Sequence, residues 1–203
     1  MAFSDGILFC KQFLANPRQV GAIWPSSRHL ARCMVEWIEW ERVSAVMEVG
    51  PGTGVFTEAI LHSAGPDTRC IALEINAMMA QALRQRFETV QVHTASVAEA
   101  PQICQRVGVD GVDAVLSGLP WAVFSQQEQQ EMLDAIVRVM RTDGQFCTFA
   151  YLQGLLLPAA RKFRRLLESR FPMVETSPIV WRNLPPAIVY RCRLAGDTRV
   201  ATP

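Results

Sequence analysis

A repeated alternation of short apolar segments and longer amphipathic segments constrains the fold of this chain more than any other feature. Residues 44–50, SAVMEVG, form an apolar run of strand length, and a glycine-rich turn and the helical pattern VFTEAILHSA follow it. The same order occurs four more times. Successive units of this kind build a parallel sheet with helices on both faces. The other four strand-like segments cover residues 68–74, 89–93, 113–119 and 145–151.

Two more strand-like segments follow the last helical pattern, at 174–180 and 187–194, and bring the expected number of strands to seven. They are separated by WRNLPP and could pair with each other in antiparallel fashion at one edge of the sheet. Before them, a helix is predicted from Gln126 to Met140, where the turn Thr142-Asp143-Gly144 leads into the next strand. Its apolar stripe is interpreted as core.

The segment before the first strand is predicted to be a helical extension, residues 1–42, attached to a main domain of residues 43–203. FSDGILFCKQFL has helical spacing of its apolar residues, NPRQVGAIWPSS has the composition of a loop, and RHLARCMVEWIEW reads as a second helix. Ser26 or Ser27 is the expected N-cap of that second helix. Such an extension could cover a binding site.

Length and composition exclude several classes of protein. The chain has 203 residues, of which 50% are hydrophobic and 19% charged, as expected of one globular domain that buries a sizeable core. Its six cysteines contain no CxxC pair and its three histidines lie far apart, so neither a metal site nor a disulfide framework is predicted. The sequence shows no signal peptide and no apolar run long enough to cross a bilayer, which favours a cytoplasmic protein. We also expect the chain to be a monomer.

Charge is distributed unevenly along the chain. Residues 1–35 carry a net charge of +3, residues 36–159 carry −8 and residues 160–203 carry +6, although the whole chain is only +1. Two basic ends around an acidic middle indicate a surface for an anionic partner, either lipid headgroups or nucleic acid phosphates. Ordinary solvated helix faces are the alternative explanation.

A glycine-rich loop follows the first strand and is the strongest functional signal in the chain. The run EVGPGTG contains Glu48, Gly50, Gly52, Thr53 and Gly54. Its three glycines let the backbone turn sharply and approach a ligand closely, and the helix behind the loop presents free N–H groups at its start. The spacing differs from that of dinucleotide-binding dehydrogenases. The alternative is a tight turn with no ligand.

A second acidic residue supports a ligand with a ribose. Glu74 ends the second strand, 26 residues after Glu48, where α/β nucleotide-binding folds place an acid that accepts hydrogen bonds from ribose hydroxyls. Glu48 could meet a positively charged amino group, which a pyrophosphate-binding loop would not require. Together these features resemble the class I S-adenosylmethionine-dependent methyltransferases. That resemblance implies a Rossmann-like α/β fold, with a seven-stranded, mostly parallel sheet and helices on both faces.

A narrower resemblance covers about residues 9–194. The chain resembles the bacterial phospholipid N-methyltransferases, which methylate phosphatidylethanolamine, and VGAIxPSS and NxPPA are the more specific of the shared motifs. It is similar, more distantly, to the ribosomal RNA adenine dimethyltransferases, whose NLPY motif corresponds to Gly118-Leu119-Pro120-Trp121 without the asparagine and with Trp in place of Tyr. The segments that carry the resemblance are 16–34, 46–61, 116–121, 145–151 and 183–190.

The resemblance implies roles for individual residues. The glycine loop would surround the methionine part of S-adenosylmethionine, Glu74 would bind the ribose and Ile75 would flank the adenine. One departure concerns the adenine amino group, because these families carry Gly-Asp-Ala where this chain has Thr94-Ala95-Ser96, so that Ser96 or a backbone group must substitute. The implied cofactor-binding residues are Glu48, Gly50, Gly52, Thr53, Gly54, Glu74, Ile75, Ser96 and Ser117.

Two aromatic residues are candidates for positioning the methyl acceptor. Trp121 follows the fourth strand and Tyr151 ends the fifth, at the sheet edge where open α/β folds bind ligands. Aromatic rings suit a cationic headgroup through cation–π attraction, while plain packing is the alternative for both. Methyl transfer from a sulfonium needs an aligned amine and no metal.

The first helix of the extension suggests a membrane surface. Its apolar residues Phe3, Ile7, Phe13 and Leu14, together with the basic residues Lys11 and Arg18, resemble helices that lie in the headgroup region of anionic membranes. Core packing of the same residues is the rival explanation.

The sequence therefore predicts an N-methyltransferase that acts on an aminophospholipid such as phosphatidylethanolamine, peripheral to the inner face of the membrane. An RNA adenine N6-methyltransferase and a non-catalytic protein that binds S-adenosylmethionine are the alternatives, with a nucleic acid partner less favoured. The number of methyl groups transferred is not determined by the sequence.

Overall fold

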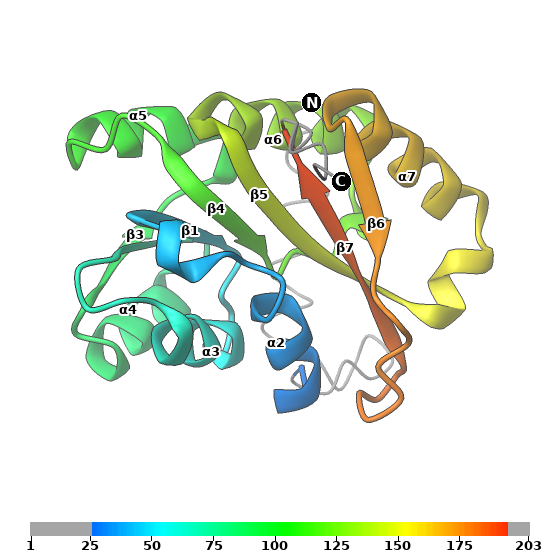
Figure 1. Cartoon of the computed structure of the whole chain (residues 1–203), viewed down its shortest axis with the longest axis horizontal. Helices are drawn as coiled ribbons and strands as arrows, with labels where there is room; N and C mark the ends of the chain where they lie inside the picture. Colours follow the sequence, from blue (N-terminus) through cyan, green and yellow to red (C-terminus); the bar gives the residue numbers. More distant parts are fainter. Residues whose placement is uncertain (1–25, 195–203) are drawn as a thin grey trace, which may run out of the picture.

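A seven-stranded sheet forms the centre of the computed structural model, which describes residues 26–194 (Figure 1). The strands lie in the order β3-β2-β1-β4-β5-β7-β6. The first five are parallel, whereas β7 runs antiparallel to both of its neighbours, so the predicted mostly parallel seven-stranded sheet is confirmed. The strands are β1 (Ala45–Val49), β2 (Arg69–Glu74), β3 (Val90–Thr94), β4 (Val112–Ser117), β5 (Met140–Tyr151), β6 (Met173–Thr176) and β7 (Ala187–Arg193).

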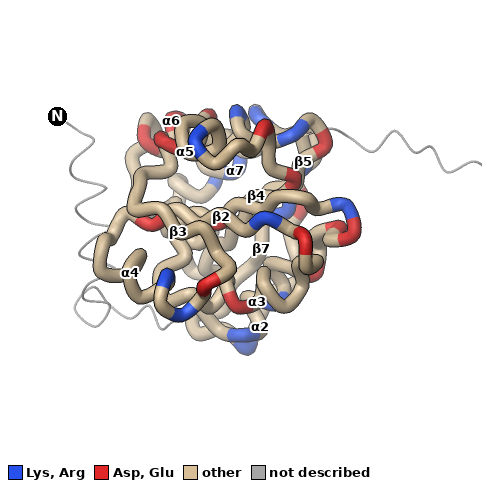
Figure 2. Tube along the Cα trace, turned by 90° about the vertical axis from the view of Figure 1, so that its left-hand side faces the viewer, with Lys and Arg blue, Asp and Glu red and all other residues tan. Residues whose placement is uncertain are grey.

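Helices cover both faces of the sheet and make a three-layer structure (Figure 2). One layer contains α5, α6 and α7, and the opposite layer contains α2, α3 and α4. The helices are α2 (Arg28–Val35), α3 (Val55–Ser63), α4 (Ala77–Arg86), α5 (Ala100–Arg106), α6 (Gln126–Val139) and α7 (Pro158–Arg170). Short 3-10 turns lie at η1 (Trp40–Arg42), η2 (Val97–Glu99), η3 (Trp121–Val123) and η4 (Leu152–Leu156).

Each helical layer packs its own hydrophobic cluster against the sheet. Phe146, Leu133 and Leu167 belong to the cluster under α5–α7, and Leu30 and Phe56 belong to the cluster under α2–α4. The central strands are buried on both sides, which explains their continuous apolar character in the sequence. Because α2 contributes to the second cluster, the described part of the N-terminal extension packs within the same core as the main domain.

The helix predicted after Ser26 or Ser27 exists but is shorter than expected. The Ser27 side chain accepts a hydrogen bond from Leu30 N and caps α2. The helix ends at Val35, because the Trp40 indole Nε1 donates to the Val35 carbonyl at 2.9 Å and the chain turns back into η1. The other helix of the extension, with Phe3, Ile7, Phe13 and Leu14, lies outside the described residues.

The boundary between α6 and β5 differs from the prediction. The helix ends at Val139, and Met140, which was expected to be helical, is already extended and pairs with Val112. The next paired residue is Gln145, opposite Ala114, so the predicted turn over 142–144 is instead an irregularity within one long strand. Pairing with β4 on both sides of it overrides the local preference for a turn.

The predicted antiparallel pair at the sheet edge is confirmed, but β6 ends early, at Thr176 instead of 180. Pro178 has no N–H to donate to a strand ladder. The chain nevertheless follows β7, since Ser177 N donates to Val189 O and Val180 forms an isolated bridge with Ala187.

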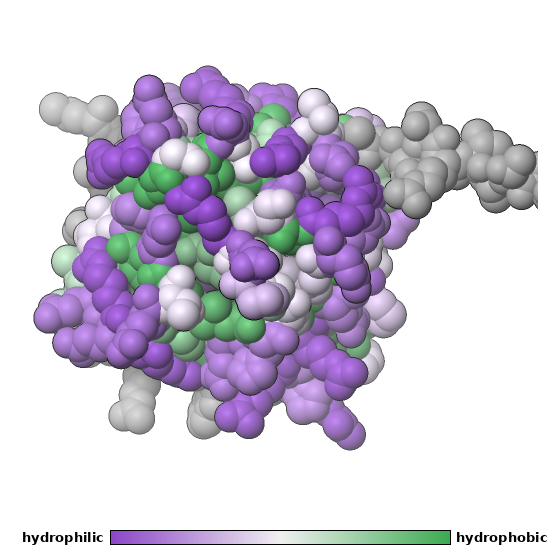
Figure 3. All heavy atoms as spheres, turned by 60° about the vertical axis from the view of Figure 1, so that its left-hand side comes forward, coloured by the Kyte–Doolittle hydropathy of each residue, from purple (hydrophilic) through white to green (hydrophobic). Residues whose placement is uncertain are grey.

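The outer surface beside the sheet edge formed by β3 is largely polar. In the view of Figure 3, hydrophilic side chains occupy the upper and lower margins of the molecule and smaller hydrophobic areas lie between them. Among residues 26–194, no helix combines the length and apolar character needed to cross a membrane.

Candidate active site

The glycine loop lies at the carboxyl edge of the sheet, between the ends of β2 and β4. Gly50 N donates to Leu73 O and Gly118 N donates to Val49 O, both at 2.9 Å. Gly52 N donates to a carboxylate oxygen of Glu74 at 3.1 Å. The three strand ends that the sequence analysis singled out are therefore joined by direct hydrogen bonds, and they form one site.

Two glycines allow the loops of this site to pack closely. Gly50 has a φ of +69°, and a Cβ there would lie 2.6 Å from Leu119 Cδ2. A Cβ on Gly118 would lie 2.4 Å from the Gly50 carbonyl oxygen. The close approach at Gly118 gives a physical reason for the missing asparagine of the NLPY pattern, because no side chain fits between the two loops.

Glu48 is buried with one oxygen still unpartnered. Its Oε2 accepts a hydrogen bond from Thr57 Oγ1 at 2.6 Å, whereas Oε1 has no hydrogen-bond partner among the described residues. Burial raises the pKa of Glu48 to about 8. An ammonium group at Oε1 would supply the missing partner and favour the carboxylate form. Thr57 was missed by the sequence analysis, although its place in the first turns of the helix after the loop could have suggested it.

Glu74 connects the glycine loop to the start of α4. Its carboxylate accepts hydrogen bonds from Gly52 N and from Asn76 N, the latter at 2.8 Å. Burial raises its pKa, and these backbone hydrogen bonds oppose the rise. Each carboxylate oxygen can accept more than one hydrogen bond, so both keep capacity for a ligand hydroxyl.

The other residues expected to bind the cofactor have different surroundings. Ile75 is half-buried directly after β2. Thr53 is exposed, and its carbonyl accepts from Arg86 Nη1 at 3.1 Å. Ser117 is fully buried, and its hydroxyl oxygen accepts from Trp121 Nε1 at 3.0 Å. The Ser117 side chain therefore organises the loop after β4, and its contact with a cofactor stays a prediction.

Ser96, the expected substitute at the adenine amino group, is the N-cap of η2. Its side chain accepts a hydrogen bond from Ala98 N, and its own N–H donates to Glu99 Oε1 at 2.8 Å, so it forms a capping box for η2. The part of Ser96 toward adenine stays a prediction.

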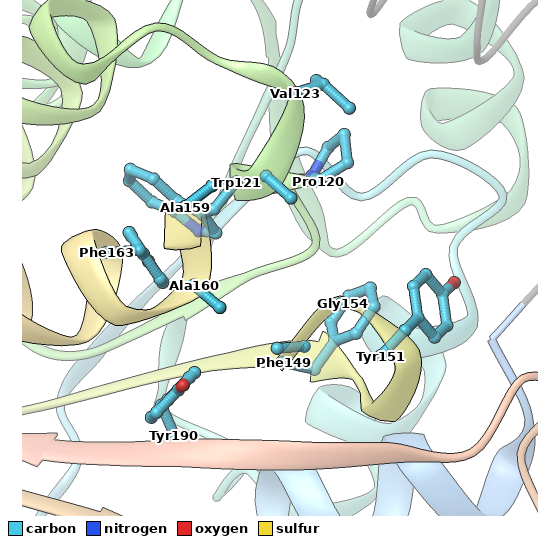
Figure 4. A pocket seen from close by; sticks show the side chains of 12 residues that line it. Pro120, Trp121, Val123, Phe149, Tyr151, Gly154, Ala159, Ala160, Phe163 and Tyr190 are labelled. Carbon is cyan, nitrogen blue, oxygen red and sulfur yellow. The ribbon is translucent and has the colours of Figure 1, made fainter. Parts of the chain in front are cut away.

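An apolar cavity of about 130 Å³ lies beside the site, between the loop after β4, the end of β5 and the start of α7 (Figure 4). Trp121 and Tyr151, the two predicted positioning residues, both line it. No acidic residue occurs among the described residues that line it, which are Pro120, Trp121, Ala122, Val123, Phe149, Ala150, Tyr151, Gly154, Ala159, Ala160, Phe163 and Tyr190.

Aromatic contacts hold the walls of the cavity. Trp121 is only 3% exposed and stacks on Phe163 with 5.0 Å between ring centroids, while Tyr190 meets Phe163 edge-on at 6.1 Å. Tyr151 meets Phe149 edge-on at 5.3 Å. Burial raises the pKa of Tyr151 to about 12, so its hydroxyl stays protonated at neutral pH.

The sequence analysis missed Phe163 and Tyr190 as members of this cavity. They lie on α7 and β7, far from the glycine loop in the sequence. Both are buried in the hydrophobic cluster under α5–α7. No local signal marks them, because they come together only where Phe163 on α7 packs against Trp121 of η3 and against Tyr190 of β7. Within residues 26–194, no group of three or more His, Cys, Asp or Glu side chains could hold a metal ion.

The family described as "Methyltransferase domain" matches residues 46–144, from β1 into the start of β5. An ornithine lipid N-methyltransferase of Singulisphaera acidiphila is 33% identical to this chain over 192 residues, which cover 93% of this chain and 96% of that protein. The similarity to that protein therefore extends well beyond the residues that the family model matches.

Solved structures with the same fold have much lower sequence identity. An N-methyltransferase, NodS, from Bradyrhizobium japonicum in complex with S-adenosyl-L-homocysteine has a TM-score of 0.65 at 14% identity, with 93% of this chain and 98% of that chain covered. An O-methyltransferase from Bacillus cereus, also in complex with S-adenosylhomocysteine, has a TM-score of 0.62 at 14% identity, with 92% and 90% covered. These two likenesses establish the fold.

Proposed function

Because the chain belongs to the class I S-adenosylmethionine-dependent methyltransferases, we propose that it methylates the primary amine of a membrane aminolipid. The acceptor class includes ornithine lipids, which the relative from Singulisphaera acidiphila is named for, and aminophospholipids such as phosphatidylethanolamine. The enzyme acts at the membrane surface, where such lipids present their amines.

The residues at the carboxyl edge fit S-adenosylmethionine. The unpartnered Oε1 of Glu48 suits the amino group of the methionine part, and the glycine loop leaves no Cβ between backbone and ligand. Glu74 keeps lone pairs for ribose hydroxyls while its other contacts hold the loop. When bound, the cofactor supplies a methyl group on a positively charged sulfur, which makes that carbon open to attack by a lone pair.

One observation carries the proposal for the acceptor. The loop Gly118-Leu119-Pro120-Trp121 begins against the glycine loop, where a Cβ on Gly118 would lie 2.4 Å from the Gly50 carbonyl oxygen, and ends in the wall of the aromatic cavity. The same four residues thus border both the cofactor loop and the cavity. An amine held at Pro120 and Trp121 lies next to the cofactor site, and the apolar lining favours its neutral form or a methylated cation.

The chain's contribution to the reaction is mainly alignment. An amine must lose its proton before its nitrogen can form the new bond to the methyl carbon, while the carbon–sulfur bond breaks and its electron pair stays on sulfur. No carboxylate of residues 26–194 lines the cavity, and Tyr151 with a pKa of about 12 remains protonated, so we propose that the proton goes to water. Correct placement of two reactants can supply about 7–11 kcal/mol of the barrier reduction.

A transfer assay with labelled S-adenosylmethionine tests the proposal. The purified chain is mixed with detergent micelles that contain ornithine lipid, phosphatidylethanolamine or phosphatidylcholine, and in parallel with ribosomal RNA. The organic and aqueous phases are counted separately, and the lipid products are resolved by chromatography. Phosphatidylcholine is the matched control, because its nitrogen already carries three methyl groups.

The expected result is label in the organic phase with at least one of the two primary amines and none with phosphatidylcholine. The chromatogram then identifies which of the two lipids is used and how many methyl groups are added. Label only in RNA would replace the proposal with the RNA adenine methyltransferase alternative. Label in neither phase, with binding of S-adenosylhomocysteine confirmed by calorimetry, would show that the acceptor is not an aminolipid.

A further inference from the structure

Several large apolar side chains remain exposed at the carboxyl edge of the sheet. Five of them occur among the described residues, and four follow β5 or precede β7, at the carboxyl edge of the sheet. We propose that these four form a surface that inserts into the headgroup region of an anionic lipid bilayer. We name them the apolar rim: Leu156 is 82% exposed, Leu157 54%, Trp181 69% and Leu184 71%.

Hydrogen bonds connect the two segments of the apolar rim. Leu152 N, at the start of η4, donates to Pro186 O at 2.8 Å, and Tyr151 pairs with Ala187 where β5 and β7 meet. The turn that carries Leu156 and Leu157 and the loop that carries Trp181 and Leu184 therefore start from the same place, where β5 ends and β7 begins. Figure 1 shows both segments, in yellow and orange, at the same corner of the molecule.

Buried contacts hold the second loop against the fold. Asn183 is 2% exposed, its Oδ1 accepts from Ser27 N at 2.8 Å and its Nδ2 donates to Pro185 O at 2.7 Å. Arg182 and Leu184, on either side of the buried Asn183, are exposed. Trp181 and Leu184 are thus exposed in an ordered loop, and no described residue covers them.

The charge around the apolar rim matches an anionic surface. No Asp or Glu occurs over residues 151–167 or 176–194, the two segments that contain the rim. Arg161 and Lys162 are exposed on the first turns of α7, and Arg182 is exposed between Trp181 and Asn183. Basic side chains beside a membrane surface are attracted to its anionic headgroups.

The same surface fits a bilayer better than a protein partner. Tryptophan favours the membrane interface, and leucines beside basic groups are typical of peptides that lie in the headgroup region. The rim is also continuous with the proposed acceptor site, since Gly154 lines the cavity two residues before Leu156. This inference rests on the proposed function, because docking here would bring a lipid amine to the cavity mouth.

Sedimentation of the full chain with vesicles tests the apolar rim by measuring membrane binding, independently of methyl transfer. The vesicles contain phosphatidylcholine and phosphatidylglycerol at about 7:3. The double variant Trp181→Ala/Leu184→Ser removes two rim side chains. Met78→Ser is the matched control, since Met78 is 79% exposed on α4, which connects β2 and β3 at the end of the sheet opposite β7 and β6. The double variant is expected to lower the partition coefficient roughly tenfold or more, and the control by less than about twofold.

A second measurement separates docking from folding and from catalysis. The double variant is expected to keep its melting temperature and its transfer to detergent-dispersed aminolipid. Vesicle binding equal to wild type would overturn the inference, as would an equal loss in Met78→Ser. A wild-type dimer that the double variant converts to a monomer, with vesicle binding unchanged, would show that a second copy of the chain occupies the rim. Absence of any lipid transfer in detergent would refute the proposed function alone.

Discussion

Substitution of Gly118 by alanine tests whether the close approach of two loops builds the cofactor site. In the native structure a Cβ at this position would lie 2.4 Å from the Gly50 carbonyl oxygen and 3.5 Å from Phe56. Favourable contacts of carbon lie at about 3.5–4 Å, so the two loops must separate by about 1 Å. The backbone of Gly50 cannot rotate away as a flexible side chain would.

The size of the effect follows from this geometry. Overpacking in a tight site destabilises a protein by about 1–3 kcal/mol. Replacement of glycine by alanine opposes this by about 0.4–1 kcal/mol, because it lowers the conformational entropy of the unfolded chain. We therefore expect Gly118→Ala to lower the free energy of unfolding by about 1–2 kcal/mol and the melting temperature by about 3–6 °C. Displacement of the loop by about 1 Å is expected to lower the rate of methyl transfer about 100-fold.

Thermal unfolding, calorimetric titration with S-adenosylhomocysteine and the transfer assay measure these effects. Gly65→Ala is the matched control, because a Cβ there would lie 3.5 Å from Thr68 Oγ1, an ordinary contact. It is expected to be neutral or slightly stabilising. If Gly118→Ala were as stable and as active as Gly65→Ala, the packing of Gly118 against Gly50 would not be what shapes the site.

Three further predictions concern the carboxylates and the cavity. Glu74→Ala is expected to weaken S-adenosylmethionine binding roughly 10-fold or more, since ligand contacts and the Gly52 anchor are both lost, and unchanged calorimetric affinity would remove Glu74 from the site. Because the pKa of Glu48 is about 8 in the free protein, binding of an ammonium group should release a proton near pH 7 and strengthen as pH rises from 6 to 8. Calorimetry in buffers of different ionisation enthalpy measures this release, and its persistence in Glu48→Gln would contradict the assignment. Phe163→Ala should enlarge the cavity, destabilise the protein by about 3–5 kcal/mol and raise the KM for the aminolipid with little change in cofactor affinity, which steady-state kinetics and calorimetry together would test.

The alternation of strands and helices was predictable because each element carries its own periodicity. Segments such as Ser44–Gly50 are apolar because both faces of a central strand are covered, and the helices keep one apolar stripe. The glycine loop and Glu74 were also predictable, since they occupy set places relative to two strand ends. Errors occurred at boundaries. At Met140 pairing with β4 decided the outcome, and at Pro178 the missing N–H ended the strand early.

The tertiary structure decided what the sequence left open about the site. Glu48 has an oxygen without a partner among residues 26–194 because β1 is buried between two layers, and Gly118 is confined because the loop after β4 meets Gly50. The cavity and the apolar rim combine residues from β5, α7 and the loop before β7. A local pattern records which face of an element is buried. It does not show which distant element covers that face, and the packing of these distant elements places the aromatic walls beside the glycine loop.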